Sequence, residues 1–174
     1  REFTFNTVTD SGGGTDTSLD ANVTTTLTVN GVNDPPTVAV TDADATFTEG
    51  GTVSTAALFT GVDIDTIESG DTVASATLTM SGVNATDTLT IAGEVITGLD
   101  TNIGTTALGA TGHSYSITGG VLTITFNAGT TDVQAETILN GLAFAIVDGD
   151  DLDTTTREFT FNTVTDSGGG TDTS

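Results

Sequence analysis

Apolar and polar residues alternate along much of this chain, as expected for β-strands that bury one face. In residues 2–9 the alternation places Phe3 and Phe5 on one side, with threonines around them. In residues 72–81 it separates a row of Ala, Leu and Met from a row of Val, Ser and Thr. Further strands are predicted at 23–29, 37–41, 46–48, 53–59, 88–91, 115–117, 121–126, 142–147 and 157–165.

Glycine-rich and acidic segments separate these strands and indicate turns. Gly119-Gly120 joins two of the strands as a hairpin, and residues 93–112 predict a long excursion with a small hairpin. Residues 61–66, followed by Glu68 and Asp71, are expected to form an acidic loop that leads into the strand at 72–81. Smaller turns are predicted at 11–16, 49–51 and 148–151.

Residues 131–141 break the strand pattern. They begin with Thr131-Asp132, a helix N-cap signal, and end with Asn140-Gly141, a stop signal. The segment predicts a short helix of about two to three turns. The expected fold class is therefore all-β, an antiparallel Greek-key β-sandwich of cadherin/Ig-like type, with this one short helix crossing between the sheets.

The only two prolines, Pro35 and Pro36, are adjacent and divide the chain. A Pro-Pro step fixes φ twice and removes two main-chain donors, so it suits a stiff joint between folded units. Residues 1–34 are predicted to be the C-terminal hairpin of one repeat plus a linker. Residues 35–174 are predicted to be a β-sandwich repeat that lacks its last strand.

Residues 1–18 recur without change at 157–174, which gives a period of 156 residues. Such identity indicates a tandem array of all-β domains, with an engineered duplication of one hairpin as the alternative. The expected partners are neighbouring identical repeats, head to tail. Because the counterpart of residues 19–30 would follow residue 174, residues 19–30 of another molecule are a candidate donor strand for the open edge. The alternative is that the chain is part of a natural array, in which the neighbouring repeat fills this edge.

The chain carries 24 acidic residues and only two basic ones, Arg1 and Arg157, so its net charge is −22. Nucleic acid and anionic membranes need a basic footprint, so this charge argues against both and favours cations as partners. No run of about 18 apolar residues is present, so membrane insertion is not expected. Cysteine and lysine are absent, which excludes disulfides and lysine crosslinks as staples.

Carboxylates at alternate positions, with main-chain oxygens between them, form the kind of ligand set that Ca²⁺ prefers. The spacing occurs at Asp63-x-Asp65 with Glu68, and at Asp148-x-Asp150-Asp151 with Asp153. Since no lysine neutralises these carboxylates, a bound cation would offset their repulsion. The alternative is a set of solvated acidic loops without an ion.

Five segments of the period form a recognisable set of motifs. They are Glu49-Gly50-Gly51, Asp63-Ile64-Asp65, the helix with Leu142-Ala143-Phe144, Asp148-Gly149-Asp150 and the closing Val32-Asn33-Asp34-Pro35-Pro36. Over the whole period this set resembles the bacterial cadherin-like repeats. These repeats occur in giant secreted adhesins and RTX-type surface proteins of Gram-negative bacteria. The resemblance implies a secreted or cell-surface extender domain that is strung head to tail and rigidified by Ca²⁺ at the joints.

By position, the resemblance assigns Asn33 and Asp34 to linker ligands, Glu49 to an early acidic ligand, and Asp63 and Asp65 to a paired-Asp loop. The longer Asp-x-Asn-Asp-Asn linker and the Asp-Arg-Glu signature of animal cadherins are missing. With the acidic turn included, the candidate calcium ligands are Asn33, Asp34, Glu49, Asp63, Asp65, Asp148, Asp150 and Asp151.

The expected function is a structural extender repeat of a large bacterial adhesin or filament, as found in biofilms. The alternative is a carbohydrate- or cell-binding adhesion module that uses exposed loops, with a glycan as partner. An enzyme is not expected, because His113 is the only histidine and there is no Cys, Lys or Trp. Thr-x-Thr patterns occur in ice-binding surfaces, but they are also the ordinary solvent face of a secreted β-sandwich.

Overall fold

The computed structural model describes residues 1–5, 8–9, 11–12, 23–47, 55–146, 154–168 and 173–174. The chain forms two compact units, Arg1–Val32 and Asn33–Ser174. The predicted turns at 49–51 and 148–151 lie outside the described residues. Within the described residues, no helix is long and apolar enough to cross a bilayer.

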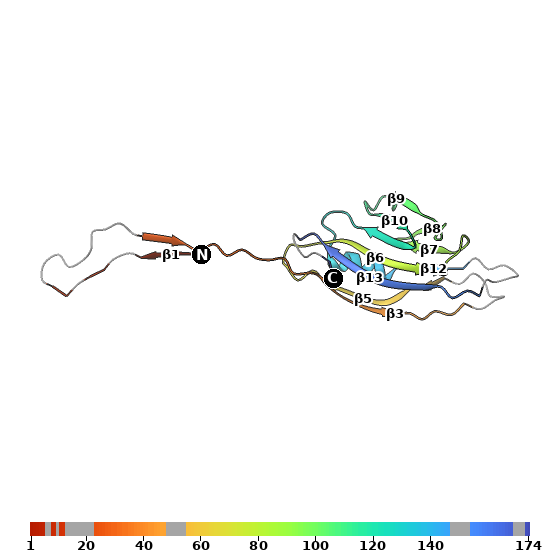
Figure 1. Ribbon diagram of the computed structural model, residues 1–174, viewed down its shortest axis with the longest axis horizontal. Coiled ribbons are helices and arrows are strands. Elements are labelled where there is room, and N and C mark those ends of the chain that lie inside the picture. The colour runs from red at the N-terminus through yellow and green to blue at the C-terminus, as the bar shows by residue number, and fades with distance from the viewer. Residues whose placement is uncertain (6–7, 10, 13–22, 48–54, 147–153, 169–172) are drawn as a thin grey trace. The chain divides into compact units, whose positions relative to one another are not determined.

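The first unit is a two-stranded antiparallel ladder of β1 (Glu2–Phe5) and β2 (Val23–Thr26), as predicted (Figure 1). The ladder continues beyond these strands, because the Leu27 N–H donates to the Arg1 carbonyl at 2.9 Å. Apolar side chains of this unit are exposed, including Phe3 at 60% and Leu27 at 57%. A lone two-stranded hairpin is marginally stable in water, because it has no second layer on which to bury such side chains.

The described residues of the second unit form antiparallel sheets and one helix, so the predicted all-β sandwich is confirmed (Figure 1). Its five-stranded sheet has the order β13 (Glu158–Asp166), β6 (Val73–Ser81), β11 (Val121–Thr125), β10 (Ser114–Thr118) and β9 (Ile103–Ala107). Its four-stranded sheet has the order β4 (Thr55–Ala57), β12 (Ala143–Ala145), β7 (Thr88–Ile91) and β8 (Glu94–Ile96). A further ladder pairs β3 (Thr37–Asp42) with β5 (Phe59–Asp65).

Alternation along β6 and β11 builds the centre of the core. Ala76, Leu78 and Met80 are buried on β6, and Leu122 and Ile124 are buried on β11, as their period of two predicts. The β10–β11 hairpin turns at Gly119-Gly120, where φ is 59° and 80°. Positive φ at both central residues is the geometry of a two-residue hairpin turn, and glycine adopts it without steric cost.

The predicted helix is α1 (Asp132–Asn140), which links β11 of one sheet to β12 of the other. The Gln134 N–H donates to Thr131 Oγ1, and the Thr131 N–H donates to Gln134 Oε1, which together form a capping box. Ala135 and Leu139 are buried in the core. The helix ends at Asn140, and the N–H of its C-cap residue, Gly141, donates to the Thr137 carbonyl.

The predicted acidic loop at 61–66 is wrong, because most of it is strand β5. Phe59, Val62 and Ile64 are buried along this strand, while Asp63 and Asp65 alternate with them on the solvent side. The edge of β5 that faces away from β3 is capped by side chains of α1. The Val62 N–H donates to Asn140 Oδ1, and the Ile64 N–H donates to Glu136 Oε1, both at 2.8 Å. These bonds satisfy main-chain donors that would otherwise be left on a strand edge.

Two other predicted boundaries also differ from the structure. The strand expected at 53–59 ends at Ala57, and the chain bends at Leu58 before β5 begins. Residues 46 and 47 are not in a strand; they follow Asp44, whose φ of 45° interrupts extended backbone. The excursion at 93–112 contributes β8 and β9 to two different sheets.

The burial pattern of β11 leads to a test. Ile124 is fully buried, whereas its neighbour Thr125 is exposed at the end of the same strand. We expect Ile124→Ala to lower the free energy of unfolding by about 2–5 kcal/mol, because it leaves a cavity in the core. Thr125→Ala, the matched control, should change it by less than about 1 kcal/mol. Urea unfolding measures both, and equal losses would contradict the assigned inward face.

Candidate functional site

One end of the second unit gathers carboxylates from distant parts of the chain. Strand β5 ends there at Asp65, α1 begins at Asp132, and β13 ends at Asp166, which pairs with Val73 at the start of β6. We call this end the acidic pole and define it by Asn33, Asp34, Asp65, Glu68, Asp132 and Asp166.

Hydrogen bonds hold the segments of the acidic pole together. The Asp34 N–H donates to Glu68 Oε1 at 2.8 Å, which fixes the entering chain to the connection between β5 and β6. The N–H and the hydroxyl of Thr66 lie 3.4 Å and 3.5 Å from Asp132 Oδ2, which joins the same connection to the helix. The Gly168 N–H donates to Asp166 Oδ1 at 2.9 Å and closes the turn after β13.

Three buried carboxylate oxygens of the acidic pole have no hydrogen-bond partner in the described part of the chain. They are Glu68 Oε2, Asp132 Oδ1 and Asp166 Oδ2. Asp166 as a whole is only 2% exposed. A buried polar atom without a partner costs about 1–3 kcal/mol, and more when it is charged. A hard cation would supply the missing partner, and oxygen-only donors are those that Ca²⁺ and Mg²⁺ prefer.

The backbone of the acidic pole is strained at Ile67. Its φ of 66° lies in the left-handed region, which a β-branched residue adopts only when the surroundings impose it. The Ile67 N–H donates to Asp65 Oδ1 at 2.8 Å and so holds this conformation. Strain of this kind tends to gather at ligand sites.

The carboxylates of the acidic pole do not converge on one point. Among the described residues, no group of three His, Cys, Asp or Glu side chains is arranged to hold a metal ion. An ion at the acidic pole would therefore need main-chain or water oxygens besides one or two of these carboxylates.

The structure describes four of the eight predicted ligands. Asn33 lies against Gly168, where a Cβ would overlap the Asn33 side-chain amide, so a larger residue at 168 would displace that amide. Asp34 and Asp65 are exposed at the acidic pole, and Asp63 is exposed on the solvent face of β5. Glu49, Asp148, Asp150 and Asp151 lie outside the described residues.

Sequence reasoning did not select Asp132 and Asp166 as candidate ligands. Asp132 was recognised only as part of the helix cap. Asp166 occupies the last position of β13, inside the repeated segment, and is followed in the sequence by Ser-Gly-Gly. An acid that ends an alternating strand just before a glycine-rich turn is the signal that could have indicated it.

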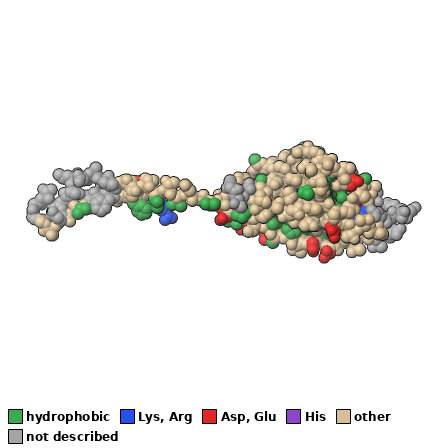
Figure 2. Space-filling view, in the orientation of Figure 1, with side chains coloured by type: hydrophobic (Ala, Val, Ile, Leu, Met, Phe, Trp, Pro, Cys, Tyr) green, Lys and Arg blue, Asp and Glu red, His purple; other side chains and the backbone are tan. Residues whose placement is uncertain are grey.

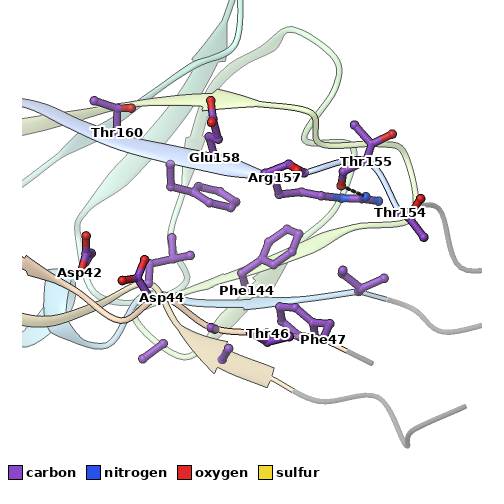
Figure 3. A pocket seen from close by; sticks show the side chains of 17 residues that line it. Asp42, Asp44, Thr46, Phe47, Phe144, Thr154, Thr155, Arg157, Glu158 and Thr160 are labelled. Carbon is purple, nitrogen blue, oxygen red and sulfur yellow. Dashed lines mark hydrogen bonds between the residues drawn. The ribbon is translucent and has the colours of Figure 1, made fainter. Parts of the chain in front are cut away.

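A groove of about 780 Å³ opens beside β13 (Figure 3). One wall is the start of β13 with Glu158 and Thr160, and the other is the segment that carries Asp42 and Asp44. Aromatic rings lie between these walls. The Phe144 ring centroid is 5.8 Å from that of Phe47 and 5.0 Å from that of Phe159. The groove is therefore apolar inside and polar along its rims.

Arg157 lines the end of this groove and is the only Lys or Arg between residues 33 and 174. Its Nε donates to Asp87 Oδ2 at 3.0 Å and its Nη2 lies 3.4 Å from Oδ1, so the ion pair is bidentate. The two side chains are 6% and 0% exposed. The one cation of the second unit is thus committed to a buried carboxylate outside the acidic pole.

Comparison with protein-family models, with curated proteins and with solved structures found no match to this chain. The cadherin-like resemblance therefore stays an expectation from the residues quoted above.

The repeat supplies its own control for the Arg157–Asp87 pair, because Arg1 occupies the same position in the first copy of the repeated segment. We expect Arg157→Met to lower the free energy of unfolding by about 3–5 kcal/mol, since it leaves Asp87 buried without its cation. Arg1→Met should change it by less than about 0.5 kcal/mol, because the Arg1 side chain is exposed.

Replacing both partners tests the same pair from the other direction. The double variant Arg157→Met/Asp87→Leu should recover much of the stability lost in Arg157→Met. Chemical unfolding of the three variants provides the measurement. Equal effects of Arg157→Met and Arg1→Met would contradict the structural role of the pair.

Proposed function

We propose that this chain is a structural extender repeat of a large secreted or cell-surface bacterial adhesin or filament. The observation that carries the proposal is the place of the repeated segment in the fold. Residues 157–174 repeat residues 1–18, and in the second unit they supply β13, whose Val164 is fully buried. A segment that supplies a core strand of one domain and recurs at the interval of a domain is expected of the repeating units of a tandem array.

Calcium is proposed as the clamp of this array. The acidic pole supports it because three buried carboxylate oxygens lack partners in the described chain and the only Lys or Arg of the second unit is paired with Asp87 outside the acidic pole. The acidic pole also holds Asn33 and Asp34, where the chain enters the second unit after the linker. Ca²⁺ bound there would restrain the linker and so limit bending between repeats.

The extender function predicts how size scales with repeat number. In chains of two, four and six periods, the maximum dimension from small-angle X-ray scattering should rise in proportion to the number of periods in Ca²⁺. With a chelator it should rise less steeply, because unrestrained linkers bend. A maximum dimension that grows only slowly, as for modules that collapse on one another, would contradict a spacer.

The calcium clamp predicts a stability change in the single chain. Ca²⁺ at 100 times its dissociation constant should raise the free energy of unfolding by about 2.7 kcal/mol over the chelated protein, and thermal unfolding measures this as a shift of several degrees. Asp166→Asn and Glu68→Gln should each reduce the shift, because each replaces a charged carboxylate of the acidic pole with a neutral amide, which is a weaker calcium ligand.

Asp63→Asn is the matched control for these variants, because Asp63 is exposed on the face of β5 and should leave the calcium shift unchanged. Isothermal titration of the same proteins gives affinity and stoichiometry. If Ca²⁺ does not change the thermal stability of the parent chain, the acidic pole is a solvated surface without a bound ion. If Asp63→Asn reduces the calcium-dependent stability shift as much as Asp166→Asn does, the ion binds at the Asp63-x-Asp65 site predicted from the sequence.

A further inference from the structure

The outer edge of β13 is open where it borders the groove. Among the residues that the structure describes, no strand pairs with that edge over Glu158–Phe161. Pairing on that side is seen only near the end of the strand, where Thr165 bridges Thr173 and the Ser174 N–H donates to the Val164 carbonyl at 2.9 Å. An open edge above an apolar groove is a receptor for a further strand.

The hydrogen-bonding direction of β13 is fixed by its neighbour. The Met80 N–H donates to the Gly120 carbonyl on the β11 side, so the adjacent β6 residues Thr79 and Ser81 direct their main-chain groups toward β13. These two residues pair with Thr160 and Glu158. Phe159 of β13, and Arg157 immediately before the strand, alternate with these residues, so their main-chain groups face the outer side of the sheet.

The first unit contains the same sequence with that edge occupied. Arg1 and Phe3 correspond to Arg157 and Phe159 in the repeat, and they face β2. Arg1 pairs with Leu27 through main-chain bonds of 2.9 Å, and Phe3 pairs with Thr25. Residues 23–27 of this segment thus already pair with this strand sequence, in a defined register.

That register would direct the apolar side chains of the segment into the groove. Directly opposed residues of an antiparallel pair point to the same face of the sheet. Arg157 and Phe159 point into the second unit, toward Asp87 and Phe144. Residues placed opposite them, Leu27 and Thr25, would therefore face the groove, and Val29 would follow with the same parity. Thr24, Thr26 and Thr28 would face solvent.

In the first unit these apolar side chains have no core to enter. Leu27 is 57% exposed and Val29 is 72% exposed, and Figure 2 shows hydrophobic side chains along the surface of the hairpin. Since residues 1–10 and 157–166 are identical, moving the segment from β1 to β13 would keep the ladder hydrogen bonds. It would add burial of Leu27 and Val29 against the phenylalanines of the groove.

We propose that residues 23–29 of one copy of this chain pair antiparallel with β13 of a second copy, with Leu27 opposite Arg157 and Thr25 opposite Phe159. Each copy then offers one donor segment and one acceptor edge, so association is head to tail and open-ended. The contact is made by main-chain bonds and apolar burial. It needs no calcium. In the tandem array proposed above, the neighbouring repeat would fill this edge with the same pairing.

Mixed single-cysteine chains test the register, because the parent has no cysteine. Thr24→Cys in one chain and Thr160→Cys in another would be opposed in a non-hydrogen-bonded pair, as Thr24 and Thr4 are in the first unit. Mixed in chelator under mild oxidation, they should form a disulfide-linked heterodimer.

The matched control for the crosslink is Thr28→Cys mixed with Thr160→Cys. Thr28 has the same outward parity, but it would lie about 13 Å along the strand from the opposed position. It should crosslink far more slowly. Equal rates for the two mixtures, or no crosslink in either, would overturn the proposed pairing.

Light scattering coupled to size exclusion tests the energetic basis. The parent chain in chelator should show a mass that rises with concentration. Leu27→Asp should weaken self-association by roughly tenfold or more, while Thr28→Asp should associate like the parent. Leu27 lies outside Asn33–Ser174, so unchanged thermal unfolding of the second unit confirms that the variant is folded. A strictly monomeric parent at high concentration, or equal effects of the two variants, would overturn the proposal.

Discussion

The antiparallel pairing of β13 with β6 is the interaction on which the rest of the second unit depends. In its middle, Phe161 lies opposite Leu78, and β13 carries phenylalanines that reach elements outside its own sheet: Phe159 contacts Phe144 of β12, and Phe161 contacts Phe59 of β5. At one end the strand brings Asp166 to the acidic pole, and at the other it brings Arg157 to the groove. The repeated segment therefore contributes to the core, to the acidic pole and to the open edge beside the groove, so a change in its register would disturb all three.

Charge is the second constraint on this molecule. The second unit has one Lys or Arg, and that residue is held by Asp87 in a buried pair, so no basic side chain is left for the carboxylates of the acidic pole. Figure 2 shows acidic side chains at several places on the visible face of this unit. Exposed carboxylates are screened by water and salt, but the buried oxygens of Glu68, Asp132 and Asp166 are not. This contrast between exposed and buried acids is the physical reason to assign a cation to the acidic pole and not to the acidic surface in general.

Sequence patterns predicted the elements well where one signal acted alone. Alternation located β6 and β11, and the Thr131–Gln134 capping box marked the start of α1. At residues 61–66 two signals conflicted, since acidic composition indicated a loop and alternation indicated a strand. The strand prevails because Val62 and Ile64 enter the core and because Asn140 and Glu136 of the helix bind the main chain of β5. Those partners are far away in sequence, so no local pattern could reveal them.

The sequence by itself determined the period of 156 residues, the all-β class, the single helix and the excess of carboxylates, because these follow from local spacing and composition. Only the tertiary structure decided which carboxylates lie together. Asp63 and Asp65 are close in sequence, yet only Asp65, at the end of β5, reaches the acidic pole, while Asp63 lies on the exposed face of the strand. Asp132 and Asp166 come to the acidic pole from a helix start and a strand end. Tertiary structure also decided that the edge of β13 lies over an apolar groove. Both outcomes depend on where elements that are distant in the sequence end in space, and local sequence patterns do not predict those positions.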